Sequence, residues 1–87
     1  MKIKEGYILK EIAGSFIVVA VGSAALDFNG VITLNETGAF LWKVLSEGKD
    51  EAELITAMMG EYEIDEQTAK ADIAAFLKKL SDEGLLA

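Results

Sequence analysis

Carboxylates are the side chains of this sequence that are numerous and close enough together to suggest acid–base or metal chemistry. They gather between residues 50 and 66, as Asp50, Glu51, Glu53, Glu61, Glu63, Asp65 and Glu66. Paired carboxylates can share a proton or bind a hard cation. However, Asp50 and Asp65 stand where helix caps are needed, and the others fall on predicted solvent faces. We therefore expect these residues to cap and solvate helices.

Histidine and cysteine are both absent. Their absence excludes serine–histidine and cysteine–histidine nucleophilic catalysis, together with imidazole and thiolate metal sites. No GxGxxG or GxxxxGK motif occurs, so phosphate binding has no support. Asp27-Phe28-Asn29-Gly30 resembles the start of a calcium loop but lacks the later acidic ligands, which favours a β-turn. The sequence predicts a protein that is not an enzyme and holds no cofactor or metal.

The overall composition restricts the class of partner. The 87 residues are enough for one domain, which we expect to span residues 1–87, and 52% of them are apolar, which is sufficient to drive folding. Fifteen acidic residues against eight basic ones give a net charge of -7. Because nucleic-acid affinity comes largely from lysine and arginine on phosphates, DNA and RNA are poor candidates.

Hydrophobic patterning predicts no membrane segment. The longest uncharged apolar stretch, residues 12–26, is interrupted by glycines and serines and is shorter than the ~20 residues that a membrane helix needs. The first six residues include two lysines but no apolar run of signal-peptide length. We therefore expect a cytoplasmic location.

The first third of the chain is typical of strands, at about residues 7–13, 15–22 and 30–34. Residues 16–21 are continuously apolar and rich in β-branched side chains, which predicts a central strand covered on both faces. A short turn at 13–15 favours an antiparallel hairpin, and Asn29-Gly30 is the strongest turn signal before the third strand.

From Asn35 onward the periodicity is helical, with helices predicted at about 35–47, 50–60 and 65–83. Asn35 is a good N-cap, and Asp50 with Glu53 forms an acidic capping box. The predicted buried stripes are Phe40, Leu41, Val44 and Leu45; Leu54, Ile55, Met58 and Met59; and Ala69, Ile73, Phe76, Leu77 and Leu80. Leu85 and Leu86 should fold back onto the core after Gly84.

Two helical residues admit more than one interpretation. Trp42 lies off the centre of its predicted stripe, so it either seals the first helix against the sheet, which we favour, or contacts a partner. Met58 and Met59 are expected in the core, although methionines also build adaptable binding surfaces. Strands followed by helices without a linker predict an α+β fold with one shared core.

The segment Leu34-Asn35-Glu36-Thr37-Gly38-Ala39-Phe40-Leu41-Trp42 resembles the hallmark segment of the PqqD-like family, named after pyrroloquinoline quinone biosynthesis protein D. The short turn at 47–49, the entry to the last helix at 62–65, the stretch 76–80 and the end at 84–86 follow in the family's order. The resemblance covers roughly residues 26 to 87.

This resemblance implies a winged-helix-like fold, a three-stranded antiparallel sheet followed by three helices, known as a precursor-peptide recognition element. It implies a non-catalytic chaperone of natural-product or cofactor biosynthesis. Such a protein binds the leader of a ribosomally made, modified peptide and presents it to an enzyme, often a radical S-adenosylmethionine (radical SAM) enzyme.

The expected binding site is the third strand, because the middle strand of a meander has both neighbours and the third keeps a free edge. In the family the leader lies antiparallel to this strand and against the last helix. The expected peptide-binding residues are Val31, Ile32, Thr33 and Leu34 of the strand and Asp72, Ile73, Ala75, Phe76 and Lys79 of the helix. Alternation puts Val31 and Thr33 on one face and Ile32 and Leu34 on the other, and which face lines the groove stays open.

Two other function classes remain open. A winged helix also suggests a DNA-binding regulator, although the acidic residues of the last helix region outnumber its lysines. A structural or regulatory subunit that docks on an enzyme is the second alternative, and self-association is possible. The sequence does not identify the precursor peptide, the enzyme or the product.

Overall fold

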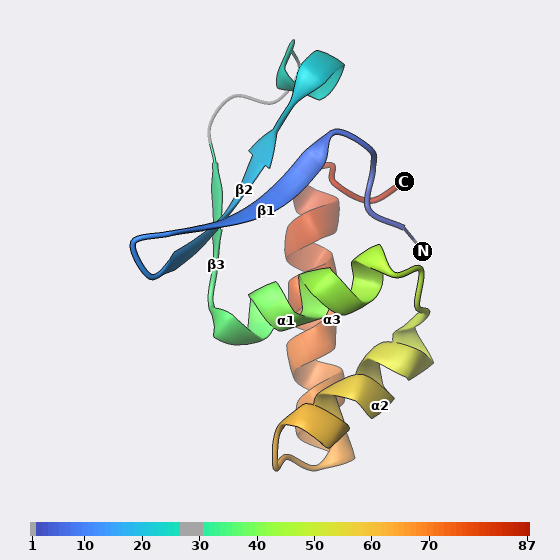
Figure 1. Ribbon diagram of the computed structural model, residues 1–87. Helices are drawn as coiled ribbons and strands as arrows, with labels where there is room; N and C mark the ends of the chain where they lie inside the picture. Colours follow the sequence, from blue (N-terminus) through green and yellow to red (C-terminus); the bar gives the residue numbers. More distant parts are fainter. Residues whose placement is uncertain (1, 27–30) are drawn as a thin grey trace.

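The computed structural model describes residues 2–26 and 31–87. Within these residues, three strands precede three α-helices, with a short 3-10 helix before the third strand (Figure 1). The elements are β1 Tyr7–Ile12, β2 Ser15–Ala20, η1 Gly22–Leu26, β3 Ile32–Leu34, α1 Glu36–Ser46, α2 Glu51–Glu61 and α3 Glu66–Asp82. The predicted α+β order is confirmed, while the turn predicted at Asn29-Gly30 lies outside the described residues.

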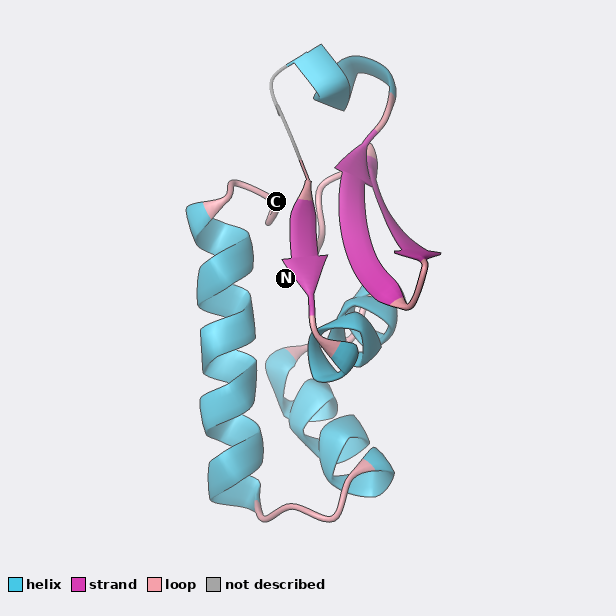
Figure 2. Ribbon diagram, turned by 90° about the vertical axis from the view of Figure 1, so that its left-hand side faces the viewer, coloured by secondary structure: helices cyan, strands magenta, loops and turns pink. Residues whose placement is uncertain are grey.

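The sheet is antiparallel with strand order β1-β2-β3, so the predicted central position of β2 is confirmed. Its predicted burial on both faces is wrong. Val18 is fully buried and pairs with Ile32, whereas Ile17 and Val19 on the opposite face are half-buried. Among the described residues, no helix covers this second face of the sheet in the view of Figure 2. β2 also ends at Ala20 rather than at residue 22, because η1 begins at Gly22.

The core lies between the inner face of the sheet and the three helices. The sheet contributes Val18, Ile32 and Leu34, and the helices contribute most of the remaining buried residues. Figure 1 shows α1 crossing in front of α3 below the strands, with α2 beneath it. In Figure 2, β3 is the strand nearest to α3, and the two elements run side by side.

The buried faces of α1 and α2 differ from the predicted stripes. Trp42 is 4% exposed and belongs to the core, whereas Phe40 and Val44 are half-buried. Trp42 therefore packs inside the protein, in agreement with the interpretation favoured above. The centre of the buried stripe of α1 is shifted toward Trp42. In α2, Met58 is buried but Met59 is 41% exposed, so the prediction of Met59 as a core residue is wrong.

Local hydrogen bonds begin each helix where the sequence predicts. Asn35 Oδ1 accepts from Gly38 N at 2.7 Å, and Asp65 Oδ1 accepts from Thr68 N at 2.7 Å. Asp50 and Glu53 form the predicted capping box, with reciprocal bonds between each side chain and the other's backbone N–H. These caps satisfy donors that have no intrahelical acceptor.

The two ends of the chain pair with one another. Lys4 N donates to Leu85 O at 2.8 Å, and Ala87 N donates to Lys2 O at 2.8 Å. Leu85 is fully buried, which confirms that the segment after α3 folds back onto the core. Among the described helices, none is both long and apolar enough to cross a membrane.

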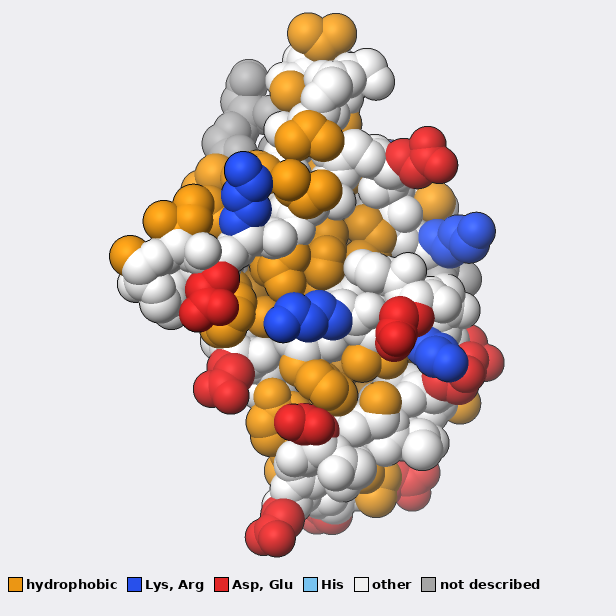
Figure 3. Space-filling view, viewed as in Figure 1, with side chains coloured by type: hydrophobic (Ala, Val, Ile, Leu, Met, Phe, Trp, Pro, Cys, Tyr) orange, Lys and Arg blue, Asp and Glu red, His pale blue; other side chains and the backbone are white. Residues whose placement is uncertain are grey.

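The open face of the sheet carries an apolar surface. Pairing of Ile8 with Val19 and of Lys10 with Ile17 sets the residues of this face, which also includes Ile12. Ile8 is 39% exposed and Ile12 is 54% exposed. Hydrophobic side chains gather over the strands in Figure 3, while most acidic side chains lie toward the helical part.

Candidate functional site: the groove between β3 and α3

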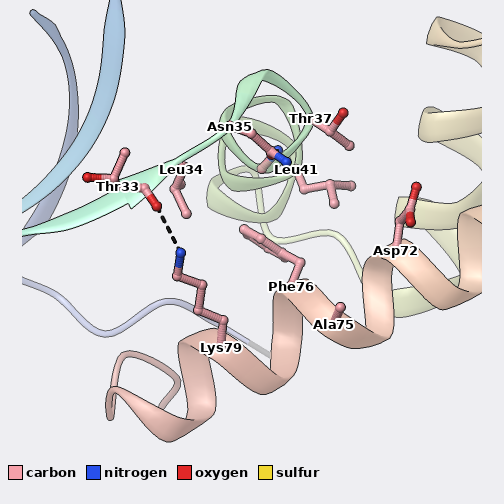
Figure 4. Close-up of a pocket in the computed structure, with 10 residues that line it drawn as sticks. Thr33, Leu34, Asn35, Thr37, Leu41, Asp72, Ala75, Phe76 and Lys79 are labelled. Atoms are coloured by element: carbon pink, nitrogen blue, oxygen red, sulfur yellow. Dashed lines mark hydrogen bonds between the residues drawn. The ribbon is translucent and has the colours of Figure 1, made fainter.

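A groove of about 470 Å³ runs between β3 and α3 and ends against the first turn of α1. Its lining residues come from all three elements, and Figure 4 shows them facing one another. They are Thr33, Leu34, Asn35, Thr37, Gly38, Leu41, Asp72, Ala75, Phe76 and Lys79.

The edge of β3 presents the backbone of Thr33 to this groove. Lys79 Nζ donates to Thr33 O at 2.8 Å from α3, which lies on the side of β3 away from β2 (Figure 4). In an antiparallel ladder, alternate residues direct both N–H and C=O toward the neighbouring strand, and the residues between them direct both groups outward. Thr33 is therefore an outward residue, and Ile32 and Leu34 bond to β2. The N–H of Thr33 faces the groove beside its carbonyl.

The floor of the groove is apolar and its rim is polar. Leu34, Leu41 and Phe76 form the floor and are 5%, 1% and 6% exposed. Thr33, Asn35, Asp72 and Lys79 are exposed around them. Such a combination suits a ligand that buries apolar side chains and satisfies its polar backbone at the same time.

Lys79 and Asp72 mark opposite ends of the helical wall. They lie seven residues apart on α3, which corresponds to about 10 Å along the helix axis, and Figure 4 shows Lys79 opposite Thr33 and Asp72 toward Thr37. The groove therefore has a positive end beside the middle of β3 and a negative end beside the start of α1.

A glycine allows α1 to approach β3 closely at the end of the groove. A Cβ atom on Gly38 would lie 3.1 Å from Asn35 Oδ1 and 3.3 Å from Leu34 Cβ. Both distances are tighter than ordinary contacts, so a side chain there would push the cap and the strand end apart.

Six of the nine residues expected at the site line the groove: Thr33, Leu34, Asp72, Ala75, Phe76 and Lys79. Ile73 is fully buried and Ile32 is 6% exposed, so both lie in the core beneath it. Val31 is 57% exposed and is not among the lining residues. Leu34 lines the groove from the inner face of β3, and Thr33 lines it through its edge.

Sequence reasoning missed four lining residues, Asn35, Thr37, Gly38 and Leu41. A signal was present, because Asn35 follows Leu34 directly and caps α1. With no linker between strand and helix, the first turn of α1 has to close one end of any groove beside β3.

Comparison with known proteins identifies the family. The family model for coenzyme PQQ synthesis protein D (PqqD) matches residues 15–86. A search of curated proteins found no match.

Two solved structures have the same fold. TbiB1 in complex with the TbiA(beta) leader peptide is 27% identical with a TM-score of 0.79, and the match covers 99% of this chain and 94% of that one. Lasso peptide synthetase B1, complexed with the leader peptide, is 21% identical with a TM-score of 0.77, covering 99% and 95% of the two chains. The second likeness shows the fold alone. Because the family model for PqqD matches most of the length of this chain, the chain belongs to the PqqD family.

Proposed function

We propose that this chain is a non-catalytic recognition domain, spanning residues 1–87, that binds the leader of a ribosomally made precursor peptide and presents it to a modifying enzyme. The leader docks antiparallel to β3 as a fourth strand, in the groove against α3. Membership of the PqqD family supports this function, as does the TbiA(beta) leader peptide bound to TbiB1.

The observation that carries the proposal is the outward backbone of Thr33 beside an apolar floor. Strand addition draws affinity from main-chain hydrogen bonds and specificity from pockets for alternate side chains. Thr33 supplies the main-chain partners, and Leu34, Leu41 and Phe76 supply the pocket. An apolar leader residue that enters near Phe76 would bury surface worth about 25 cal/mol per Å².

The chemistry of the lining residues favours binding over catalysis. Asp72 and Lys79 are the ionisable side chains among those that line the groove, and both are exposed. They stand about 10 Å apart along α3, which is too far for direct proton transfer between them. The enzyme that modifies the peptide is then a separate protein, and a radical SAM enzyme is our first candidate. We place both in the cytoplasm.

Thr33→Pro tests the binding mode directly. Proline removes the outward N–H of residue 33 while the β2-facing bonds of Ile32 and Leu34 remain. If the neighbouring genes encode a short precursor peptide, its labelled leader segment is the probe, and binding is measured by fluorescence anisotropy. Affinity should fall at least about tenfold, or roughly 1.4 kcal/mol.

Thr33→Ala is the matched control, because alanine keeps the N–H and removes only the exposed side chain. It should bind like the wild type, and circular dichroism should show that both variants fold. If a folded Thr33→Pro protein binds the leader as tightly as the wild type, the edge of β3 is not the site. A pull-down that recovers an enzyme without any peptide binding would favour a docking subunit instead.

A further inference from the structure

Lys79 occupies the position that a docking strand requires. Its ammonium donates to the Thr33 carbonyl at 2.8 Å, a contact between residues 46 apart in the sequence. A fourth strand on β3 would direct a backbone N–H to the same carbonyl. Lys79 therefore satisfies the outward carbonyl of Thr33 in the unbound protein, where a fourth strand would otherwise supply the donor.

We propose that Lys79 is a latch that also selects the peptide. This inference rests on the proposed leader binding. The incoming strand displaces the Lys79 ammonium from the Thr33 carbonyl, and the ammonium then pairs with an acidic side chain of the peptide. The ligand class is thus an extended peptide with Asp or Glu near the C-terminal end of its docked segment.

Among the described residues, the Lys79 ammonium forms a hydrogen bond to Thr33 O and no ion pair. Three ion pairs occur among the described residues, Lys49–Glu53, Lys70–Glu66 and Lys78–Asp82, and Lys79 takes part in none of them. If a peptide displaced Lys79 without offering a carboxylate, the ammonium would exchange its hydrogen bond to the Thr33 carbonyl for hydrogen bonds to water. A carboxylate on the peptide provides a hydrogen bond that is assisted by charge on both sides and is therefore stronger.

The direction of the chain fixes where this carboxylate belongs. β3 and α3 run in opposite directions along the groove (Figure 4), and every strand pair in the described sheet is antiparallel. A strand antiparallel to β3 therefore runs from the Asp72 end toward the Lys79 end. Its N-terminal part meets the Asp72 carboxylate, which repels an acidic residue, and its C-terminal part meets Lys79.

Local charge outweighs net charge at this site. The chain carries a net charge of -7, which would repel an acidic peptide at long range. At physiological ionic strength the Debye length is about 8 Å, so exposed charges beyond that distance are largely screened. For a carboxylate that contacts Lys79, attraction to the ammonium outweighs repulsion by Asp72, which lies about 10 Å away along the helix.

A displayed library of random ten-residue peptides tests the inference without knowledge of the natural leader. Selection is run on the wild type, on Lys79→Met and on Lys43→Met. Methionine keeps the length of the side chain and its helical propensity. Lys43→Met is matched in charge, because Lys43 is exposed on α1 and does not line the groove.

The wild type and Lys43→Met should enrich peptides with Asp or Glu in the C-terminal half. Lys79→Met should lose this enrichment, and it should bind a selected peptide with Glu changed to Gln roughly fivefold more tightly than the wild type does, because no ammonium has to leave Thr33. Selected peptides should lose binding to Thr33→Pro.

The failures of the two proposals are distinguishable. If no protein selects any peptide, the proposed function fails. If peptides are selected and depend on Thr33 but show no acidic preference, or if Lys79→Met keeps the preference, the function stands and the latch is overturned. Enrichment of acids in the N-terminal half would overturn the antiparallel direction.

Discussion

At the scale of single residues, Asn35 both starts α1 and lines the groove. Its Oδ1 accepts from Gly38 N, and the residue stands between the end of β3 and the first helical turn. Asp65 caps α3 in the same way but is not a lining residue of the groove. The two residues therefore separate the effect of a lost cap from the effect of an altered site.

Asn35→Ala should destabilise the protein by about 1 kcal/mol, as the loss of an N-cap usually does. It should also weaken leader binding, because the wall of the groove changes with it. Asp65→Ala removes a cap as well but should leave affinity unchanged. Urea unfolding and peptide titration of both variants check this. The prediction is wrong if Asp65→Ala binds the leader more weakly than the wild type, or if Asn35→Ala binds it equally well.

Asp65 also predicts a pH dependence of stability. Hydrogen bonds from the Thr68 side chain, and then from its backbone, hold the pKa of Asp65 below the ordinary value of 3.8. Because the folded pKa lies below the unfolded one, the stabilisation is complete above about pH 4 and is lost as the pH falls through the folded pKa.

Asp65→Asn provides the corresponding measurement. Asparagine keeps a cap oxygen but carries no charge, so the variant should be less stable than the wild type at neutral pH. The difference between their urea midpoints should shrink as the pH falls below about 4. A difference that stays constant down to pH 2 would show that ionisation of Asp65 does not contribute.

At the scale of elements, features set by neighbouring residues could be predicted and features set by packing could not. The caps at Asn35, Asp50 and Asp65 follow from residues three positions apart, and all three are present. The burial of Trp42 and the exposure of Met59 depend on how α1 and α2 face other elements, which periodicity alone does not fix.

The same distinction explains the errors at the groove and around the strands. The edge of β3 and the lining face of α3 follow from alternation and helical spacing, but Ile73 points into the core and the first turn of α1 closes the groove. The 3-10 helix η1 was not predicted, since Gly22–Leu26 carries no helical periodicity. Its position depends on a tertiary contact with the chain before β1.

Two glycines test this account of the elements. Gly60 lies in α2, and a Cβ atom there would meet nothing within 4 Å, so Gly60→Ala should stabilise the protein by about 0.5 kcal/mol. Gly6 has φ +94°, and a Cβ atom there would lie 2.6 Å from Ala24 Cβ of η1. Gly6→Ala should destabilise by about 1–3 kcal/mol. Thermal unfolding measures both effects, and equal shifts for the two variants would contradict the packing of η1.

At the scale of the whole molecule, the charges of α3 disfavour the DNA-binding alternative. Within Glu66–Asp82, Lys70 pairs with Glu66 at 3.6 Å, Lys78 pairs with Asp82 at 2.7 Å, and Lys79 bonds to Thr33. All three lysines of the helix thus have partners, in a chain of net charge -7. A recognition helix needs cations that reach phosphates. Salt-dependent DNA binding at micromolar protein would overturn this conclusion.

The open face of the sheet and the net charge of the chain together predict weak self-association that depends on salt. Two strands of six residues and one of three present on the order of 250 Å², well below the roughly 800 Å² per partner of a stable interface. Two copies can therefore attract one another weakly through Ile8 and Ile12, against the repulsion of their charges. Because salt screens that repulsion and leaves apolar burial intact, association should grow with ionic strength.

Sedimentation equilibrium at low and high NaCl tests this last prediction. The wild type should be monomeric at low salt and should associate weakly and reversibly at high salt. Ile12→Lys places a charge on the open face and should suppress that association. Met59→Lys is the matched control, because Met59 is 41% exposed on α2 and the change of charge is the same. Either substitution reduces the magnitude of the net charge of -7 by one and so weakens the repulsion. If Met59→Lys suppresses association as strongly as Ile12→Lys does, the sheet face is therefore not the contact, and association that falls with salt would also exclude the apolar face as its cause.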